Sequence, residues 1–194
     1  MRLSSFHLAA LVALGSAVAI QAAAPRETAT APINGKNVAV EYGRPTLHGR
    51  SFDELMKDLP ADRMWRTGSE QVTTLTTDTD LLIGGKKVPA GKYSLYVYCP
   101  ESGDYALAVN RDLGQPLGKI WAEAPDNLKN EPWPRSEYQK EIGDQEVVRA
   151  PMKKLAVEQP VDAFTISLQP AHQGATMTLS WGDRSWSLNL EPAS

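Results

Sequence analysis

Three arginines flank one short segment in the first third of the chain, and they form its strongest candidate for a chemical site. They lie in Tyr42-Gly43-Arg44-Pro45, His48-Gly49-Arg50 and Met64-Trp65-Arg66-Thr67-Gly68-Ser69-Glu70. A guanidinium group is a rigid fork that matches carboxylate or phosphate oxygens, and it also stacks on aromatic rings. The pattern indicates an anion-recognition site with these candidate residues: Arg44, Arg50, Trp65, Arg66, Thr67 and Glu70.

The same arginines have a structural interpretation. They could instead tie loops to the nearby carboxylates of Glu41, Asp53, Glu54 or Glu70. Structural ion pairs also shift the pKa values of the groups around them, and such pairs are commoner than binding sites. The sequence leaves both interpretations open.

Other kinds of site have weaker support. After the first 24 residues the histidines are His48 and His172 and the cysteine is Cys99, and none lies at metal-ligand spacing from another. The Asp78-Thr79-Asp80 segment is more typical of a turn than of a calcium loop. The chain has no Gly-x-Ser-x-Gly motif and no phosphate-binding glycine loop. We therefore expect no metal and no cofactor.

Strands must position these residues, because apolar and polar residues alternate along much of the chain. Alternation with a period of two is typical of half-buried strands. Gly84-Gly85, between two short apolar runs, indicates a tight hairpin turn. Repeated short strands with turn signals between them predict an all-β, mainly antiparallel β-sandwich. The clearest runs are residues 38–42, 71–79, 81–88, 93–99, 104–109, 164–168, 175–181 and 186–190.

Two segments depart from this pattern. Ser51-Phe52-Asp53-Glu54 is a capping box, which predicts one short helix ended by Pro60. Residues 122–144 form a long irregular insertion with three prolines and many charges. This insertion is either a lid or recognition loop, with Trp133 and Tyr138 as contacts, or a tolerated surface insertion.

The first 24 residues predict export. Arg2 precedes an apolar run from about Leu8 to Ile20, and Ala22-Ala23-Ala24 resembles a cleavage region, as in a secretory signal peptide. We expect residues 25–36 to be a flexible lead-in and residues 37–191 to be a single domain, with no membrane span after signal removal. Without residues 1–24 the chain has 19 basic and 23 acidic residues, a net charge of −4. A mildly acidic domain does not suggest nucleic-acid binding. Cys99 lies on an apolar strand face, so we expect a buried thiol.

Several short motifs follow one another along the chain. They are Gly43-Arg44-Pro45, Gly49-Arg50, Trp65-Arg66-Thr67-Gly68, Thr73-Thr74, Gly84-Gly85-Lys86, Ala90-Gly91-Lys92-Tyr93-Ser94-Leu95, Asn110 and Val148-Arg149. In this order they resemble the exported bacterial family catalogued as domain of unknown function 2911. The resemblance extends from about residue 37 to 190, and it implies export and a β-rich domain but no activity. Two features depart from the family pattern: Gly68-Ser69-Glu70 replaces a usual Gly-Ala-Asn, and the stretch after Asn110 is longer.

These observations favour a non-catalytic β-sandwich binding module in the periplasm or outside the cell. Its partner would be a small molecule, a glycan or an envelope protein. Two alternatives stay open, a hydrolase acting on envelope or extracellular carbohydrate or ester substrates and a structural envelope protein. The surroundings of the three arginines distinguish them: carboxylates converging in a cleft favour an enzyme, an open groove favours binding, and full burial with pairing favours structure.

Overall fold

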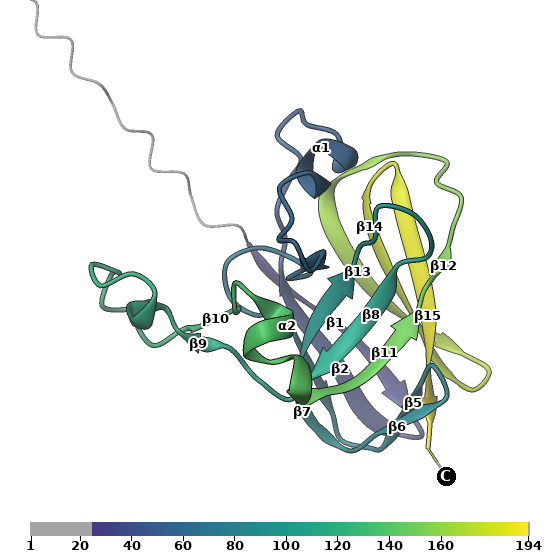
Figure 1. The fold of residues 1–194 in the computed structure, drawn as a ribbon. Helices are drawn as coiled ribbons and strands as arrows, with labels where there is room; N and C mark the ends of the chain where they lie inside the picture. Colours follow the sequence, from purple (N-terminus) through teal and green to yellow (C-terminus); the bar gives the residue numbers. More distant parts are fainter. Residues whose placement is uncertain (1–24, 194) are drawn as a thin grey trace, which may run out of the picture.

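The computed structural model describes residues 25–193 of the chain. Two antiparallel sheets lie face to face and make up most of this part (Figure 1). The all-β sandwich predicted from the alternating pattern is therefore confirmed. The expected signal peptide, residues 1–24, lies outside the described residues.

The first sheet has seven strands. Its hydrogen-bonded order is β1-β2-β4-β7-β8-β11, and β3 pairs with β7 beside that path. The strands span Arg26–Ile33 (β1), Lys36–Gly43 (β2), Met64–Trp65 (β3), Thr74–Thr77 (β4), Gly91–Tyr98 (β7), Ala106–Asn110 (β8) and Glu146–Pro151 (β11).

The second sheet has six strands in the order β13-β14-β15-β5-β6, with β12 pairing to β15. The predicted hairpin at Gly84-Gly85 joins β5 to β6, and both glycines have positive φ, as a two-residue turn of this kind requires. The strands span Leu81–Ile83 (β5), Lys86–Val88 (β6), Lys153–Lys154 (β12), Val161–Ala171 (β13), Gly174–Gly182 (β14) and Arg184–Pro192 (β15).

The main core fills the space between the two sheets. Tyr93, Leu95 and Val97 of β7 face inward, and they belong to one buried cluster with Leu179 of β14 and Trp186 of β15. Cys99 is 0% exposed in this cluster, and burial raises the pKa of its thiol to about 12. The expectation of a buried thiol is confirmed.

The expectation of a flexible lead-in at residues 25–36 is wrong. Residues Arg26–Ile33 form β1, which pairs with β2 along its whole length. Ala31 and Ile33 alternate with exposed residues and reach the core. Pro32 is compatible with this strand because β1 is the edge of its sheet, where one side needs no backbone donors. The prolines and threonines of this segment suggested a flexible chain, although the segment forms a regular strand.

The predicted capped helix is present as α1, Phe52–Met56. The Ser51 hydroxyl accepts the Glu54 backbone N–H at 3.2 Å, and the Glu54 carboxylate accepts the Ser51 backbone N–H at 2.7 Å. The helix ends at Met56, four residues before Pro60, which was expected to end it. Phe52 and Met56 bury the apolar side of α1 against the main core.

The segment between β8 and β11 packs in part on the outer face of the seven-stranded sheet, and it contains the predicted insertion at residues 122–144. Before the insertion lie β9 (Gln115–Pro116) and a 3₁₀ turn at Leu117–Lys119. The insertion itself holds β10 (Pro132–Trp133) and α2 (Tyr138–Glu141), and a second 3₁₀ turn at Gly143–Gln145 ends it. Tyr138 and Ile142 pack on Met64, Tyr96 and Ala108 in a second buried cluster. Residues 117–131, which we call the arm, project away from both sheets (Figure 1). Within residues 25–193, no helix is long and apolar enough to span a membrane.

Substitutions in β1 can test whether this strand is part of the folded domain. Ile33→Ala removes a fully buried side chain, and we expect it to lower the free energy of unfolding by about 2–5 kcal/mol. Thr30→Ala on the exposed side of the same strand is the matched control and should change it by less than about 0.5 kcal/mol. Urea unfolding measures both, and an Ile33→Ala protein as stable as the control would contradict the assignment of β1 to the core.

Candidate functional site

Arg66 leaves the end of β3 on the outer side of the seven-stranded sheet. Successive residues of a strand point to opposite faces. Met64 joins the outer cluster, Trp65 joins the main core between the sheets, and the next side chain again points outward. β3 is held in place because Met64 pairs with Tyr98 and Trp65 with Val97 of β7.

The turn after Arg66 has an unusual backbone conformation. Thr67 is fully buried with φ 55°, and Glu70 has φ 60°. Positive φ is a genuine outlier for a β-branched residue such as threonine, and it persists only where surrounding contacts enforce it. Those contacts include the Thr73 hydroxyl, which donates to the Thr67 carbonyl at 2.6 Å. The turn therefore fixes the direction in which the chain runs past Arg66.

Two glycines allow this turn to approach the end of β2. A Cβ atom on Gly43 would lie 2.2 Å from the Ser69 carbonyl oxygen, and one on Gly68 would lie 2.9 Å from the Gly43 carbonyl oxygen. Both distances are shorter than any real Cβ contact, so the two backbones could not meet if either position carried a side chain. This contact therefore brings the Gly43-Arg44-Pro45 segment next to the turn at Trp65-Arg66-Thr67-Gly68.

The insertion supplies the opposite side of the site. Arg135 donates to both carboxylate oxygens of Asp112, at 3.3 and 3.0 Å, and to the Gln115 side-chain oxygen at 3.1 Å. Its backbone N–H also donates to the Tyr96 hydroxyl at 3.3 Å. Arg135 thus links its own segment to the turn at Asp112, to β9 and to β7.

Asn110, the last residue of β8, holds these segments together through hydrogen bonds of its side chain. Its side-chain amide is fully buried, and the amide nitrogen donates to the Tyr138 hydroxyl at 3.1 Å and to the Ile142 carbonyl at 2.8 Å. Its side-chain oxygen accepts the Asp112 backbone N–H at 2.8 Å. One buried amide therefore holds both α2 and the turn that carries Asp112.

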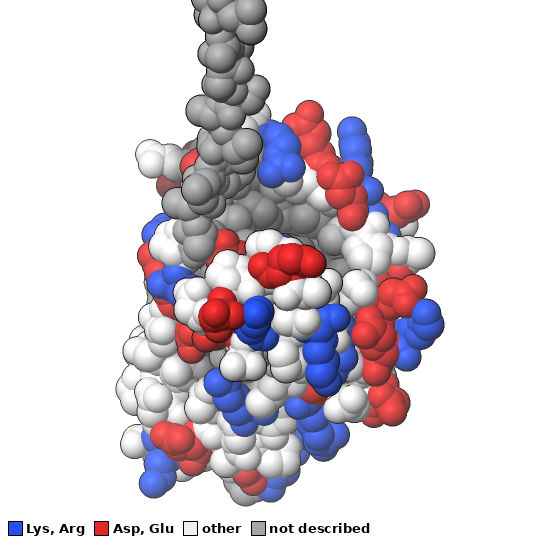
Figure 2. All heavy atoms as spheres, turned by 90° about the vertical axis from the view of Figure 1, so that its left-hand side faces the viewer, with Lys and Arg blue, Asp and Glu red and all other residues white. Residues whose placement is uncertain are grey.

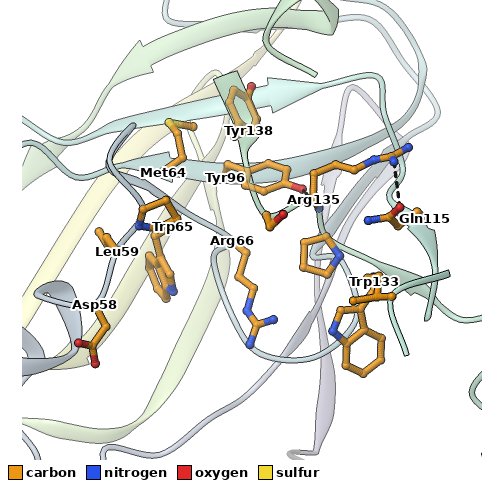
Figure 3. Close-up of a pocket in the computed structure, with 14 residues that line it drawn as sticks. Asp58, Leu59, Met64, Trp65, Arg66, Tyr96, Gln115, Trp133, Arg135 and Tyr138 are labelled. Carbon is orange, nitrogen blue, oxygen red and sulfur yellow. Dashed lines mark hydrogen bonds between the residues drawn. The ribbon is translucent and has the colours of Figure 1, made fainter. Parts of the chain in front are cut away.

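These elements enclose a cleft of about 460 Å³ between the segment around Trp65 and the insertion (Figure 3). A volume of this size lies within the range of small-molecule sites, about 300–1,000 Å³. Figure 3 shows the Arg66 side chain between the indoles of Trp65 and Trp133 in that view. The cleft is lined by Asp58, Leu59, Pro60, Met64, Trp65, Arg66, Tyr96, Gln115, Ile120, Trp133, Pro134, Arg135, Ser136 and Tyr138.

Arg66 is exposed, yet its pKa is lowered because surrounding protein removes part of its hydration; the negative charge of Glu70 opposes that shift. The two observations agree if its exposed surface faces the concave cleft instead of open solvent. Among residues 25–193, no hydrogen bond or ion pair involves the Arg66 guanidinium. Arg66 is therefore an exposed cation that lies in a cleft with largely apolar walls.

Two of the six candidate residues, Trp65 and Arg66, line this cleft. Arg44 instead forms an ion pair with Glu27 at 2.7 Å and donates to the Phe164 carbonyl and the Thr165 hydroxyl, both at 3.3 Å. It thus ties β1 and β2 to β13 across the sandwich.

The other three candidates surround the turn or lie apart from it. Arg50 is exposed and donates to the Leu47 carbonyl at 3.5 Å. Thr67 is buried in the turn itself, and Glu70 acts on Arg66 through its charge. The structure does not place Arg44, Arg50, Thr67 or Glu70 among the residues that line the cleft.

Several lining residues were not candidates from the sequence: Tyr96, Gln115, Ile120 and Arg135. Tyr96 could have been found from the sequence, because Leu95 and Val97 assign it to the opposite face of β7. A large aromatic side chain on that face indicates that another segment packs over it. Ile120 and Arg135 come from irregular backbone, and Gln115 comes from the two-residue strand β9, which is too short to leave a periodic signal. Trp133 and Tyr138, expected contacts of a recognition loop, do line the cleft.

The charges around the site are mixed. On the face shown in Figure 2, basic and acidic side chains are interspersed without a broad patch of one sign. Asp58 is the one carboxylate among the residues that line the cleft. No group of three or more His, Cys, Asp or Glu side chains within residues 25–193 could hold a metal ion.

The chain belongs to the family described as "Protein of unknown function (DUF2911)", whose family model matches residues 24–190. The resemblance seen in the motifs is thereby confirmed. No curated protein and no solved structure matches the chain.

Arg44 and Arg66 should differ in their effect on stability. Arg44→Ala removes an ion pair and two further hydrogen bonds between the sheets, and we expect it to lower the free energy of unfolding by about 1–2 kcal/mol, since the pair is partly exposed. Arg66→Ala should change it by less than about 0.5 kcal/mol, as for surface residues without partners. Urea unfolding of both variants is the measurement, and a larger loss for Arg66→Ala would show that Arg66 has a structural role.

Proposed function

We propose that this member of the family is a non-catalytic binding module that holds a small anionic ligand in the cleft, with Arg66 as the contact for the negative charge. The observation that carries the proposal is the state of Arg66, which points into an apolar-walled cleft without a hydrogen bond from its guanidinium within residues 25–193.

The physical reason is the cost of leaving such a cation without compensation. A charged group that loses hydration is costly unless it is paired and hydrogen-bonded. Arg66 lies between two indole rings that line the cleft, and desolvation by the surrounding protein lowers its pKa although the side chain keeps exposed surface. An anion entering the cleft would restore the missing hydrogen bonds, and a charge-assisted bond of this kind is stronger than a neutral one. Binding of an anion would therefore give the Arg66 guanidinium the hydrogen bonds that it does not form in the free protein.

The catalytic alternative has less support from the geometry. Hydrolysis of glycosides generally uses two carboxylates on opposite sides of the bond that breaks. Asp58 is the single carboxylate that lines the cleft, and Glu70 lies outside the lining. The structural alternative describes Arg44 well but does not account for Arg66 or the cleft.

Thermal unfolding in the presence of anions tests the proposal. Sodium acetate, sodium galacturonate and sodium phosphate are compared at equal ionic strength, because salt screens any charge-based effect. For an anion present at about ten times its Kd, we expect the melting temperature of the wild type to rise by about 3–5 °C. Arg66→Gln should lose this rise, whereas Arg50→Gln, which alters an exposed arginine outside the cleft, should retain it. An equal rise in Arg66→Gln, or none with any anion, would refute the proposed site.

We also propose that the protein acts outside the cytoplasm, because residues 1–24 have the three parts of a signal peptide. Mass spectrometry of the protein purified from its native host should show a first residue beyond Ile20. A soluble extracellular form that retains Met1 would contradict export by cleavage.

A further inference from the structure

We propose that the ligand of the cleft is a carboxylate of single charge attached to a hydroxylated ring, which is the chemistry of an acidic sugar. This inference rests on the proposed function and names the ligand class of the same site. Three observations support it: the charge available in the cleft, the kind of polar groups left free there, and the position of Trp133.

The charge available is that of one guanidinium. The charged residues that line the cleft are Asp58, Arg66 and Arg135. Arg135 is already paired with Asp112 at 3.0 Å, and Glu141 lies 4.0 Å away. Glu70 adds negative charge near Arg66, and Asp58 is a further carboxylate that lines the cleft. A phosphate monoester carries about −1.5 to −2 charges near neutral pH and would be incompletely neutralised, whereas a carboxylate matches one guanidinium.

The polar groups left free in the cleft are mostly donors. The Gln115 side-chain oxygen accepts from Arg135, so its NH₂ group remains to donate (Figure 3). The Tyr96 hydroxyl accepts the Arg135 backbone N–H and keeps its own proton, since burial raises its pKa to about 12. The Trp133 indole N–H is also without an acceptor among the described residues. Together with Arg66, these donors suit a ligand with several oxygen acceptors.

The indole ring of Trp133 forms a flat wall of the cleft, and no other aromatic ring among the described residues packs on it. Trp65 stacks on Trp181 with ring centres 5.5 Å apart, and Tyr96 packs edge-on against Tyr138 at 4.7 Å. No aromatic ring in residues 25–193 packs in this way on Trp133, which lines the cleft and is half-buried. A ring bearing C–H groups could cover this indole while its oxygens meet the donors around it. An aromatic acid would also cover the indole, but it would leave the donors of Tyr96 and Gln115 unpaired, which costs affinity.

Isothermal titration calorimetry with four probes tests this inference: galacturonate, galactose, galactose 6-phosphate and benzoate. For a ligand as small as galacturonate we expect a Kd of about 1 mM. Galactose, galactose 6-phosphate and benzoate should each bind about 10-fold more weakly or less. Arg66→Gln should reduce galacturonate binding about 10- to 100-fold and abolish its advantage over galactose.

Two tryptophan variants test the flat wall. Trp133→Leu should weaken galacturonate binding about 10-fold, because it removes the ring face and the indole N–H. Trp121→Leu is the matched control, since this exposed tryptophan lies on the arm outside the lining of the cleft. Equal losses in the two variants would show that Trp133 does not contact the ring.

The possible failures are distinguishable. Tighter, Arg66-dependent binding of galactose 6-phosphate would overturn the carboxylate class, and tighter Arg66-dependent binding of benzoate would overturn the sugar class. In both cases the proposed anion-binding function would stand. If no probe shows binding that depends on Arg66, the proposed function fails together with this inference.

Discussion

The close approach of two backbones, at Gly43 and at Gly68-Ser69, is the constraint on which the site depends. A Cβ atom at position 43 would lie 2.2 Å from the Ser69 carbonyl oxygen, so the two backbones can come this close only because residue 43 is a glycine. Because the turn is held against the end of β2, Thr67 and Glu70 adopt left-handed conformations that their side chains disfavour. Strain of this kind is typical of positions where the fold presents a functional group. Here the group is the guanidinium of Arg66.

A second set of interactions determines what faces Arg66. Asn110 joins α2 to the turn at Asp112, and Asp112 in turn orients Arg135. These bonds are buried or partly buried, so a missing partner would leave a polar group without compensation. The insertion is therefore held to the outer face of the sheet by a polar network as well as by the packing of Tyr138 and Ile142. The guanidinium of Arg66 faces this network across the cleft and takes no part in its hydrogen bonds.

The regular part of the fold could be predicted from the sequence, because burial on one face of a strand leaves a period of two. The hairpins at Gly84-Gly85 and after Tyr98, the capping box of α1 and the buried Cys99 all followed from local rules. β1 was missed because it has few large apolar residues, and because Pro25 precedes it and Pro32 lies within it. At an edge, prolines do not prevent pairing.

The site was predictable only in part. Local chemistry identified Trp65 and Arg66, and the long insertion suggested Trp133 and Tyr138. It could not separate Arg66 from Arg44, because the partner of Arg44 is Glu27, in the segment expected to be flexible. Nor could it find Gln115 or Arg135, whose positions depend on Asn110 and Asp112 and not on any periodic pattern.

A crystal structure of the protein grown with galacturonate tests the central claim most directly, because it shows which atoms meet the guanidinium of Arg66. We expect the ligand carboxylate to lie in the cleft with its oxygens about 2.7–2.9 Å from the Arg66 nitrogens, as in charge-assisted hydrogen bonds. The sugar ring should lie against Trp133. An Arg66 paired instead with a carboxylate of the protein itself, with the sugar absent from the cleft or bound elsewhere, would contradict this proposal.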